Sequence, residues 1–148
     1  MKKSLKTTLC SIILLACSQT AFAGNPLSAY AGTWANADPE GGITKVVITV
    51  KGSVAYVQAF GNCVPRDCDW GQVRSTAYSS SISTSPEKNT EAITAEYKSG
   101  PGKEVHIIEN LVISMDGSGE LHIRSLKVYT DDSGRNSQSH TYRFKKAG

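Results

Sequence analysis

Short runs of alternating apolar and polar residues fill the chain from residue 24 to residue 148. β-Branched and aromatic residues dominate the runs, and clusters of Gly, Pro, Asn, Asp and Ser separate them. Alternation with a period of two is typical of strands with one buried face. The pattern predicts eight strands, at residues 33–36, 44–50, 54–60, 73–80, 92–97, 104–114, 121–129 and 141–144.

The turns between these runs predict the topology. Residues 51–52, 99–102 and 116–119 are turn-forming segments of the kind that join neighbouring antiparallel strands. Eight strands that follow one another in this way can close into a barrel and so remove their free edges. We therefore expect an all-β fold, an eight-stranded antiparallel up-and-down barrel. A two-sheet β-sandwich is the alternative.

The seventh predicted strand changes phase along its length. Leu121 and Ile123 lie on one face of an ideal strand, whereas Leu126 and Val128 lie on the other. A bulge near Ser125 would place all four on one side, and bulges are common in barrels. The phase change therefore predicts a bulge at this position.

The first 23 residues have the features of a bacterial secretory signal peptide. A basic stretch at residues 2–6 precedes an apolar run at residues 9–17, and small residues precede a cleavage site after Ala23. The apolar run is far shorter than the roughly 20 residues of a membrane span. We expect cleavage to leave residues 24–148 as a single secreted or periplasmic domain.

A second interpretation of the leader concerns Cys17. The segment Leu14-Leu15-Ala16-Cys17 resembles a lipobox, which would make the protein a lipoprotein anchored at Cys17. Without that lipid we expect no membrane partner. The three lysines of the leader account for the whole charge excess, so 13 basic residues face 13 acidic residues in residues 24–148. This balance argues against nucleic acid as a partner.

The segment at residues 63–71, Cys-Val-Pro-Arg-Asp-Cys-Asp-Trp-Gly, holds the two cysteines of the exported part. An even pair in an oxidising compartment predicts a disulfide between Cys63 and Cys68. The spacing differs from the Cys-x-x-Cys of redox pairs, and two cysteines are too few for a zinc site. The loop is first a structural brace, worth about 2 kcal/mol by chain entropy, and second a rigid loop that presents Arg66, Asp67 and Asp69.

Two resemblances accompany these residues. Gly32-Thr33-Trp34-Ala35-Asn36 resembles the Gly-x-Trp opening of the lipocalins and avidins, which implies a calycin-like barrel with Trp34 across its closed end. In avidins the corresponding Asn lies in the biotin pocket, but the later tryptophans that wall that pocket have no counterpart here. The cysteine motif, the opening and the late Thr-Asp-x-Ser-Gly-Arg are together similar to a family of uncharacterised secreted bacterial domains, which implies a shared fold.

The chain offers no clear catalytic pattern. His106, His122 and His140 lack metal-ligand spacing, and no Gly-x-Ser-x-Gly elbow occurs. We expect no enzyme, no metal and no cofactor. The leading hypothesis is an exported non-catalytic protein that holds a small apolar or amphiphilic molecule in its barrel. The alternative is a protein-partner binder, an inhibitor or immunity-type protein that uses loop 63–68. The candidate binding residues are Asn36, Tyr56, Arg66, Asp67, Asp69 and Trp70.

Overall fold

The computed structural model describes residues 24–148 except residues 39 and 41. The predicted signal peptide, its cleavage site and Cys17 therefore lie outside the described residues. A short 3-10 helix, η1, precedes eight strands. Their bounds are η1 Leu27–Tyr30, β1 Gly32–Asn36, β2 Ile43–Lys51, β3 Val54–Gly61, β4 Cys68–Tyr78, β5 Ala92–Ser99, β6 Ile107–Met115, β7 Leu121–Tyr129 and β8 Gln138–Lys146.

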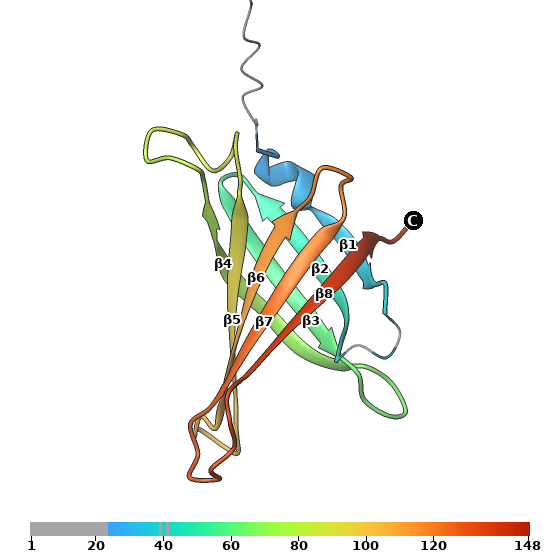
Figure 1. The fold of residues 1–148 in the computed structure, drawn as a ribbon, viewed down its shortest axis with the longest axis vertical. Coiled ribbons are helices and arrows are strands. Elements are labelled where there is room, and N and C mark those ends of the chain that lie inside the picture. The colour runs from blue at the N-terminus through green and yellow to red at the C-terminus, as the bar shows by residue number, and fades with distance from the viewer. Residues whose placement is uncertain (1–23, 39, 41) are drawn as a thin grey trace, which may run out of the picture.

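The strands form a closed antiparallel barrel in sequence order, and β8 returns to pair with β1. This confirms the predicted eight-stranded up-and-down barrel over the two-sheet sandwich. Every connection is a hairpin, so each strand pairs with its neighbours in the chain (Figure 1). The barrel thus follows directly from the order of strands and turns in the sequence.

Two expectations about the strands are wrong. β4 begins at Cys68 rather than at residue 73, because Cys68 pairs with Gly61 at the end of β3. β7 pairs with β6 without a shift of register, so no bulge occurs near Ser125. Ser125 itself faces the interior, and Leu126 is only partly buried on the outer face. The register instead shifts in β2 between Ile43 and Lys45, and where β3 meets the first part of β4.

The end of the barrel that carries η1 is filled with side chains, and we call it the capped end. Leu27 and Tyr30 of η1 are buried there. Trp34 is 1% exposed and donates from Nε1 to the Tyr30 carbonyl at 2.9 Å, so it packs in the core beneath the helix. The barrel wall completes the core through the inward positions of every strand; its largest fully buried side chains are Phe144, Ile43, Ile48, Ile93, Leu111, Ile113, Leu121, Ile123 and Val46.

The opposite end, which we call the mouth, is shaped by two pairs of neighbouring strands that have only short paired stretches, which we call the short seams. The register between β4 and β5 covers three pairs, from Thr76–Thr94 to Tyr78–Ala92, and that between β8 and β1 also covers three. These paired stretches lie toward the capped end. Figure 1 shows the long tips of β5–β8 diverging from the loop that joins β3 to β4. The four strands β1–β4 and the four strands β5–β8 therefore separate toward the mouth.

Candidate functional site: a cavity at the mouth of the barrel

A cavity of about 390 Å³ lies at the mouth, between the diverging strands β4 and β5. Its wall and floor come from four neighbouring strands. The lining residues are Asp69, Trp70, Tyr97, Lys98, Ser99, Ile107, Glu109 and Lys127. The set combines an aromatic and aliphatic wall with charged groups, which is the usual composition of a site for a small organic molecule.

The backbone around Gly71 directs Trp70 into this cavity. Gly71 has a φ of +83°, a left-handed conformation that favours glycine. Asp69 holds the turn, because its two carboxylate oxygens accept hydrogen bonds from the Gly71 backbone N–H and from Gln58 Nε2, both at 2.8 Å. The register of β4 against β3 shifts at this point, which is typical of a β-bulge that redirects a side chain.

Trp70 packs tightly against two neighbours. Its ring meets that of Tyr97 edge to face, with centroids 5.5 Å apart and an interplanar angle of 73°. On its other side it covers Gly61, where an added Cβ would lie 2.7 Å from Trp70 Nε1. Gly61 is therefore the residue that allows the indole to approach β3 this closely.

Tyr97 links the two separating halves of the barrel. Its side chain is 7% exposed, and its hydroxyl donates to the carbonyl of Val57 on β3 at 2.8 Å. Burial raises the pKa of Tyr97 well above its ordinary value of 10.0, and the nearby negative charge of Asp69 adds to the shift. The phenol therefore stays protonated at neutral pH and keeps donating to the buried Val57 on β3.

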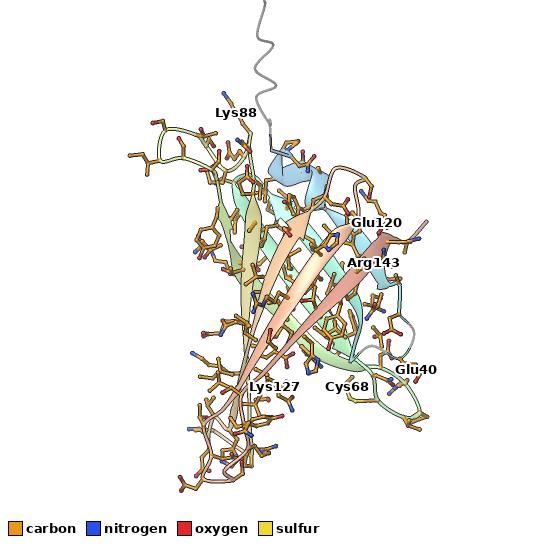
Figure 2. All side chains as sticks on the ribbon, viewed as in Figure 1. Glu40, Cys68, Lys88, Glu120, Lys127 and Arg143 are labelled. Carbon is orange, nitrogen blue, oxygen red and sulfur yellow. A yellow bond between two sulfur atoms is a disulfide. The ribbon has the colours of Figure 1, made fainter. Side chains whose placement is uncertain are left out.

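The floor of the cavity carries an ion pair. Glu109 on β6 lies directly opposite Lys127 on β7, and Glu109 is 7% exposed. Ser125 Oγ donates to one carboxylate oxygen at 2.6 Å, and Lys127 Nζ lies 3.2 Å from the other. Figure 2 shows Lys127 where the β5–β8 tips begin to leave the barrel. Both charged groups thus sit on the inner face of the sheet.

The fold alone gives no reason for this pair. Burying the Glu109 carboxylate is costly, whereas the side chain of Lys127 is 29% exposed. A well-packed apolar pair is commonly as stable as a buried ion pair or more stable. Both charges affect the pKa of the nearby Tyr142. Burial raises this pKa, Glu109 raises it further, and Lys127 lowers it. The ring of Tyr142 stacks near His140, with centroids 6.2 Å apart. The inner face of β6–β8 is therefore polar toward the mouth and apolar toward the capped end.

The six predicted binding residues divide between the cavity and the outside. Asp69 and Trp70 line the cavity. Tyr56 faces outward on β3, where Lys51 Nζ lies 5.6 Å from its ring centroid. Asn36 is occupied within the β1–β2 connection, since its Nδ2 donates to the Ile43 carbonyl at 2.6 Å.

Arg66 and Asp67 lie on the exposed connection between β3 and β4. The disulfide between Cys63 and Cys68 forms as predicted, and Figure 2 marks Cys68 at the base of this loop. The peptide bond between Val64 and Pro65 is cis. The loop is thus a separate feature from the cavity, although Trp70 and Asp69 follow it directly in the sequence.

Glu109, Lys127 and Tyr97 are not among the binding residues predicted from the sequence. A signal for the charged pair was present: each is in phase with the apolar positions of its strand, Glu109 with Leu111 and Lys127 with Ile123. A charged residue on an otherwise apolar face is informative because burying it is costly. Tyr97 has no comparable signal, since an aromatic residue is ordinary on a buried strand face.

The small inward-facing residues of β3 are packed in the core. Ala55, Val57 and Ala59 are each at most 1% exposed and belong to the core. The capped half of the barrel is therefore filled. A second hollow, of about 590 Å³, lies near the capped end. Its lining includes four hydroxyl side chains, Arg74 and Glu87, and no aromatic residue.

The two carboxylates of the mouth cavity are both engaged by polar neighbours. Asp69 and Glu109 line the same cavity, but the oxygens of both already accept hydrogen bonds or contact a cation. The two His–carboxylate pairs lie elsewhere, His122 Nε2 with Asp116 at 2.9 Å and His106 Nε2 with Glu104 at 3.0 Å. Neither histidine lines the cavity.

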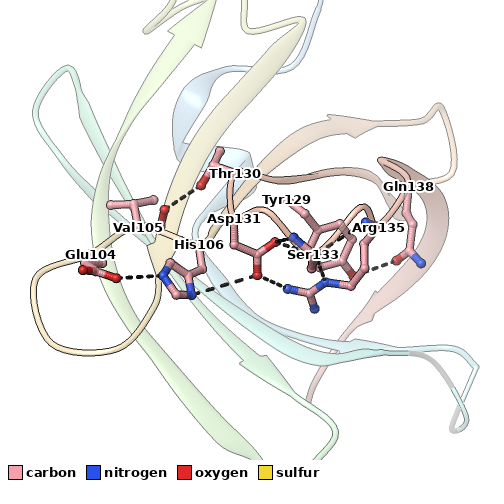
Figure 3. A network of polar contacts seen from close by, with 9 residues as sticks. All are labelled: Glu104, Val105, His106, Tyr129, Thr130, Asp131, Ser133, Arg135 and Gln138. Carbon is pink, nitrogen blue, oxygen red and sulfur yellow. Dashed lines mark hydrogen bonds and ion pairs between the residues drawn. The ribbon is translucent and has the colours of Figure 1, made fainter.

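The late Thr-Asp-x-Ser-Gly-Arg segment builds the tip of the β7–β8 hairpin (Figure 3). Asp131 accepts hydrogen bonds from Ser133 and from Arg135, whose guanidinium lies 3.9 Å from the ring centroid of Tyr129. The Ser133 hydroxyl, followed by Arg135, holds the pKa of Asp131 below its ordinary value. His106 Nδ1 lies 4.0 Å from the same carboxylate. These contacts satisfy one another, so the segment is a structural turn.

Within the described residues, no cluster of three or more His, Cys, Asp or Glu side chains is arranged to hold a metal ion. The described part of the chain also contains no helix long and apolar enough to cross a membrane. In comparisons with known proteins, no family model, no curated protein and no solved structure matches this chain. The disulfide is consistent with an extracellular or periplasmic location.

Proposed function

We propose that this protein is an exported, non-catalytic binding protein that holds one small amphiphilic molecule at the mouth of its barrel. The observation that carries the proposal is the Glu109–Lys127 pair, which lies on the inner wall of an open cavity beneath Trp70 and Tyr97. A small number of charged groups placed in a pocket is typical of sites that orient a bound molecule. A cavity of about 390 Å³ has room for a single small ligand.

The lining assigns each end of the ligand a place. Trp70, Tyr97 and Ile107 provide the apolar surface, so the hydrocarbon or aromatic part would lie against them. Lys127 has three donor hydrogens and Glu109 is its one carboxylate partner, which leaves donors for a polar end group of the ligand. This distribution favours an amphiphilic molecule over a purely apolar one.

The test is native mass spectrometry of the protein purified from the periplasm, with two matched variants. Lys127→Gln removes the ammonium of the cavity, whereas Lys145→Gln removes the ammonium that lies 3.5 Å from Glu120 near the capped end. We expect a retained small mass in the wild type and in Lys145→Gln. Its occupancy should fall about tenfold or more in Lys127→Gln, since a charge-assisted hydrogen bond is worth about 1.5–3 kcal/mol. A wild type without a bound mass, or equal occupancy in both variants, would refute the proposal.

The same spectrum addresses export. A mass that begins at Gly24 corresponds to ordinary signal-peptide cleavage, and a mass that begins at a lipidated Cys17 corresponds to an anchored lipoprotein. We propose the first, in the periplasm or outside the cell, because small residues precede Ala23 at the spacing of a cleavage site. A full-length mass that retains residues 1–23 would contradict both.

A further inference from the structure

The connection between β3 and β4 projects from the barrel as a separate loop. Figure 1 shows it leaving the mouth on the side away from the β5–β8 tips. It contains the stapled segment Cys63–Cys68, of which Cys63 is partly buried and the residues after it are exposed. None of the residues from 62 to 68 lines the mouth cavity. The loop is therefore a candidate binding site separate from the cavity.

The base of the loop is fixed by three kinds of contact. The disulfide joins its ends, with the two Cα atoms 5.5 Å apart. The backbone N–H of Asn62 donates to the Gly42 carbonyl at 3.0 Å, and Thr44 Oγ1 donates to Asp67 Oδ2 at 2.6 Å. A loop held in this way loses little conformational entropy when a partner binds it.

The tip presents one apolar side chain and one cation. Val64 is 95% exposed, more than any other valine among the described residues. Arg66, two residues later, is also exposed. The carboxylate of Asp67 accepts a hydrogen bond from Thr44, and that of Asp69 accepts hydrogen bonds from Gln58 and Gly71. Among the described residues, the ion pairs of the protein do not include Arg66.

An exposed arginine on a rigid loop suits a partner with a carboxylate at the bottom of a narrow pocket. The planar guanidinium fits a carboxylate through two parallel hydrogen bonds, and arginine is among the residues enriched at binding hot spots. Trypsin-like serine endopeptidases have such a pocket, with an aspartate at its base. Val64, two residues before Arg66, would then contact the protease surface beside the pocket.

We propose that loop 63–68 is a docking element for a trypsin-like serine endopeptidase, with Arg66 in the specificity pocket. Binding is reversible and non-covalent, and the clamped loop acts as an inhibitor because Asp67 and the disulfide hold the chain on both sides of Arg66. The interaction does not involve Glu109 or Lys127, so it is independent of the proposed ligand site.

The test measures inhibition of trypsin by the oxidised exported protein, with a chromogenic arginine substrate. We expect competitive inhibition that falls about 100-fold or more in Arg66→Ala, as for a hot-spot arginine. Arg66→Lys should retain most of the effect, because the pocket also accepts lysine. Arg124→Ala is the matched control, since Arg124 is an exposed arginine on the outer face of β7; it should inhibit as the wild type does.

A substitution that changes the protease specificity provides a second test. Arg66→Phe should lose inhibition of trypsin and gain inhibition of chymotrypsin, whose pocket is a hydrophobic slot. The proposal is overturned if the wild type does not inhibit trypsin at about 10 μM, if Arg66→Ala inhibits equally well, or if trypsin cleaves after Arg66 and inhibition disappears. Because Arg66 does not line the cavity, its variants should retain any small mass seen by native mass spectrometry, which separates this proposal from the ligand proposal.

Discussion

Replacing Tyr97 with phenylalanine removes one hydroxyl group from the inner wall of the barrel and leaves the ring in place. The hydroxyl donates to the Val57 carbonyl at 2.8 Å, and the side chain is 7% exposed, so water cannot readily replace the lost donor. A buried hydrogen bond of this kind contributes about 1–2 kcal/mol once the unpaired acceptor is included. We expect the free energy of unfolding of Tyr97→Phe at pH 7 to be lower than that of the wild type by this amount.

The pH dependence gives a second, independent prediction for the same variant. The pKa of Tyr97 is raised by burial in the folded protein, whereas in the unfolded chain it has its ordinary value of 10.0. Above pH 10 the unfolded chain releases this proton and the folded protein keeps it, so the wild type loses stability as the pH rises. At pH 11 the loss due to this one group is about 1.4 kcal/mol.

The variant lacks this ionisation, so the difference between the two proteins should narrow with rising pH. A difference of about 1–2 kcal/mol at pH 7 should fall close to zero near pH 11. Tyr30 and Tyr142 also have raised pKa values, but both proteins keep them and their effects cancel in the comparison.

Urea unfolding followed by far-UV circular dichroism at several pH values measures both effects. Tyr78→Phe is the matched control, because Tyr78 is 49% exposed and lies outside the core, so its removal should change little at any pH. A Tyr97→Phe variant as stable as the wild type at pH 7 would refute the hydrogen-bond argument. A stability difference that stays constant from pH 7 to about pH 11 would refute the burial argument.

Three further predictions concern the mouth and the turns. Gly61→Ala should lower the free energy of unfolding by about 1–3 kcal/mol and change the fluorescence of Trp70, because the new methyl group would lie 2.7 Å from the indole. Gly117→Ala is the control, since its new methyl group has no atom within 4 Å. Equal effects of the two substitutions would contradict the close approach of Trp70 to Gly61. Cys63→Ser should remain folded and lose about 2 kcal/mol, and equal melting temperatures of the wild type with and without reductant would contradict a stabilising disulfide. Hydrogen bonds from Ser118 and His122 hold the pKa of Asp116 below 3.8, so the stability due to Asp116 is lost as the pH falls below 3.8. The difference in the free energy of unfolding between the wild type and Asp116→Ala should therefore shrink on acidification. A difference that stays constant would contradict the lowered pKa of Asp116.

The amino-acid pattern determined the barrel because its information is local. Each run of alternating residues buries one face, and each Gly-, Asp- or Ser-rich turn reverses the chain, so the order of strands needs no long-range information. The seven connections of an up-and-down barrel are all of this local kind. The cysteine pair was predictable for the same reason, since Cys63 and Cys68 are close in the sequence.

The site depended on contacts between distant segments. Whether Trp70 points inward is decided by the left-handed Gly71 and by the register shift against β3, neither of which alternation alone can predict. The pairing of Glu109 with Lys127 requires the register of β6 against β7. The predicted bulge near Ser125 was wrong because Ser125 is turned inward to donate to Glu109, a polar contact that an apolar pattern does not anticipate.

The sequence by itself therefore determined an eight-stranded barrel with one stapled loop, and it named Asp69 and Trp70 among the candidate residues. Only the tertiary structure decided that the capped half is filled, that the mouth is left open by two short seams, and that an ion pair lies on its inner wall. The physical reason is the range of the interactions. Strand formation depends on neighbours in the chain, whereas a cavity depends on where strands part and on which side chains meet across the gap.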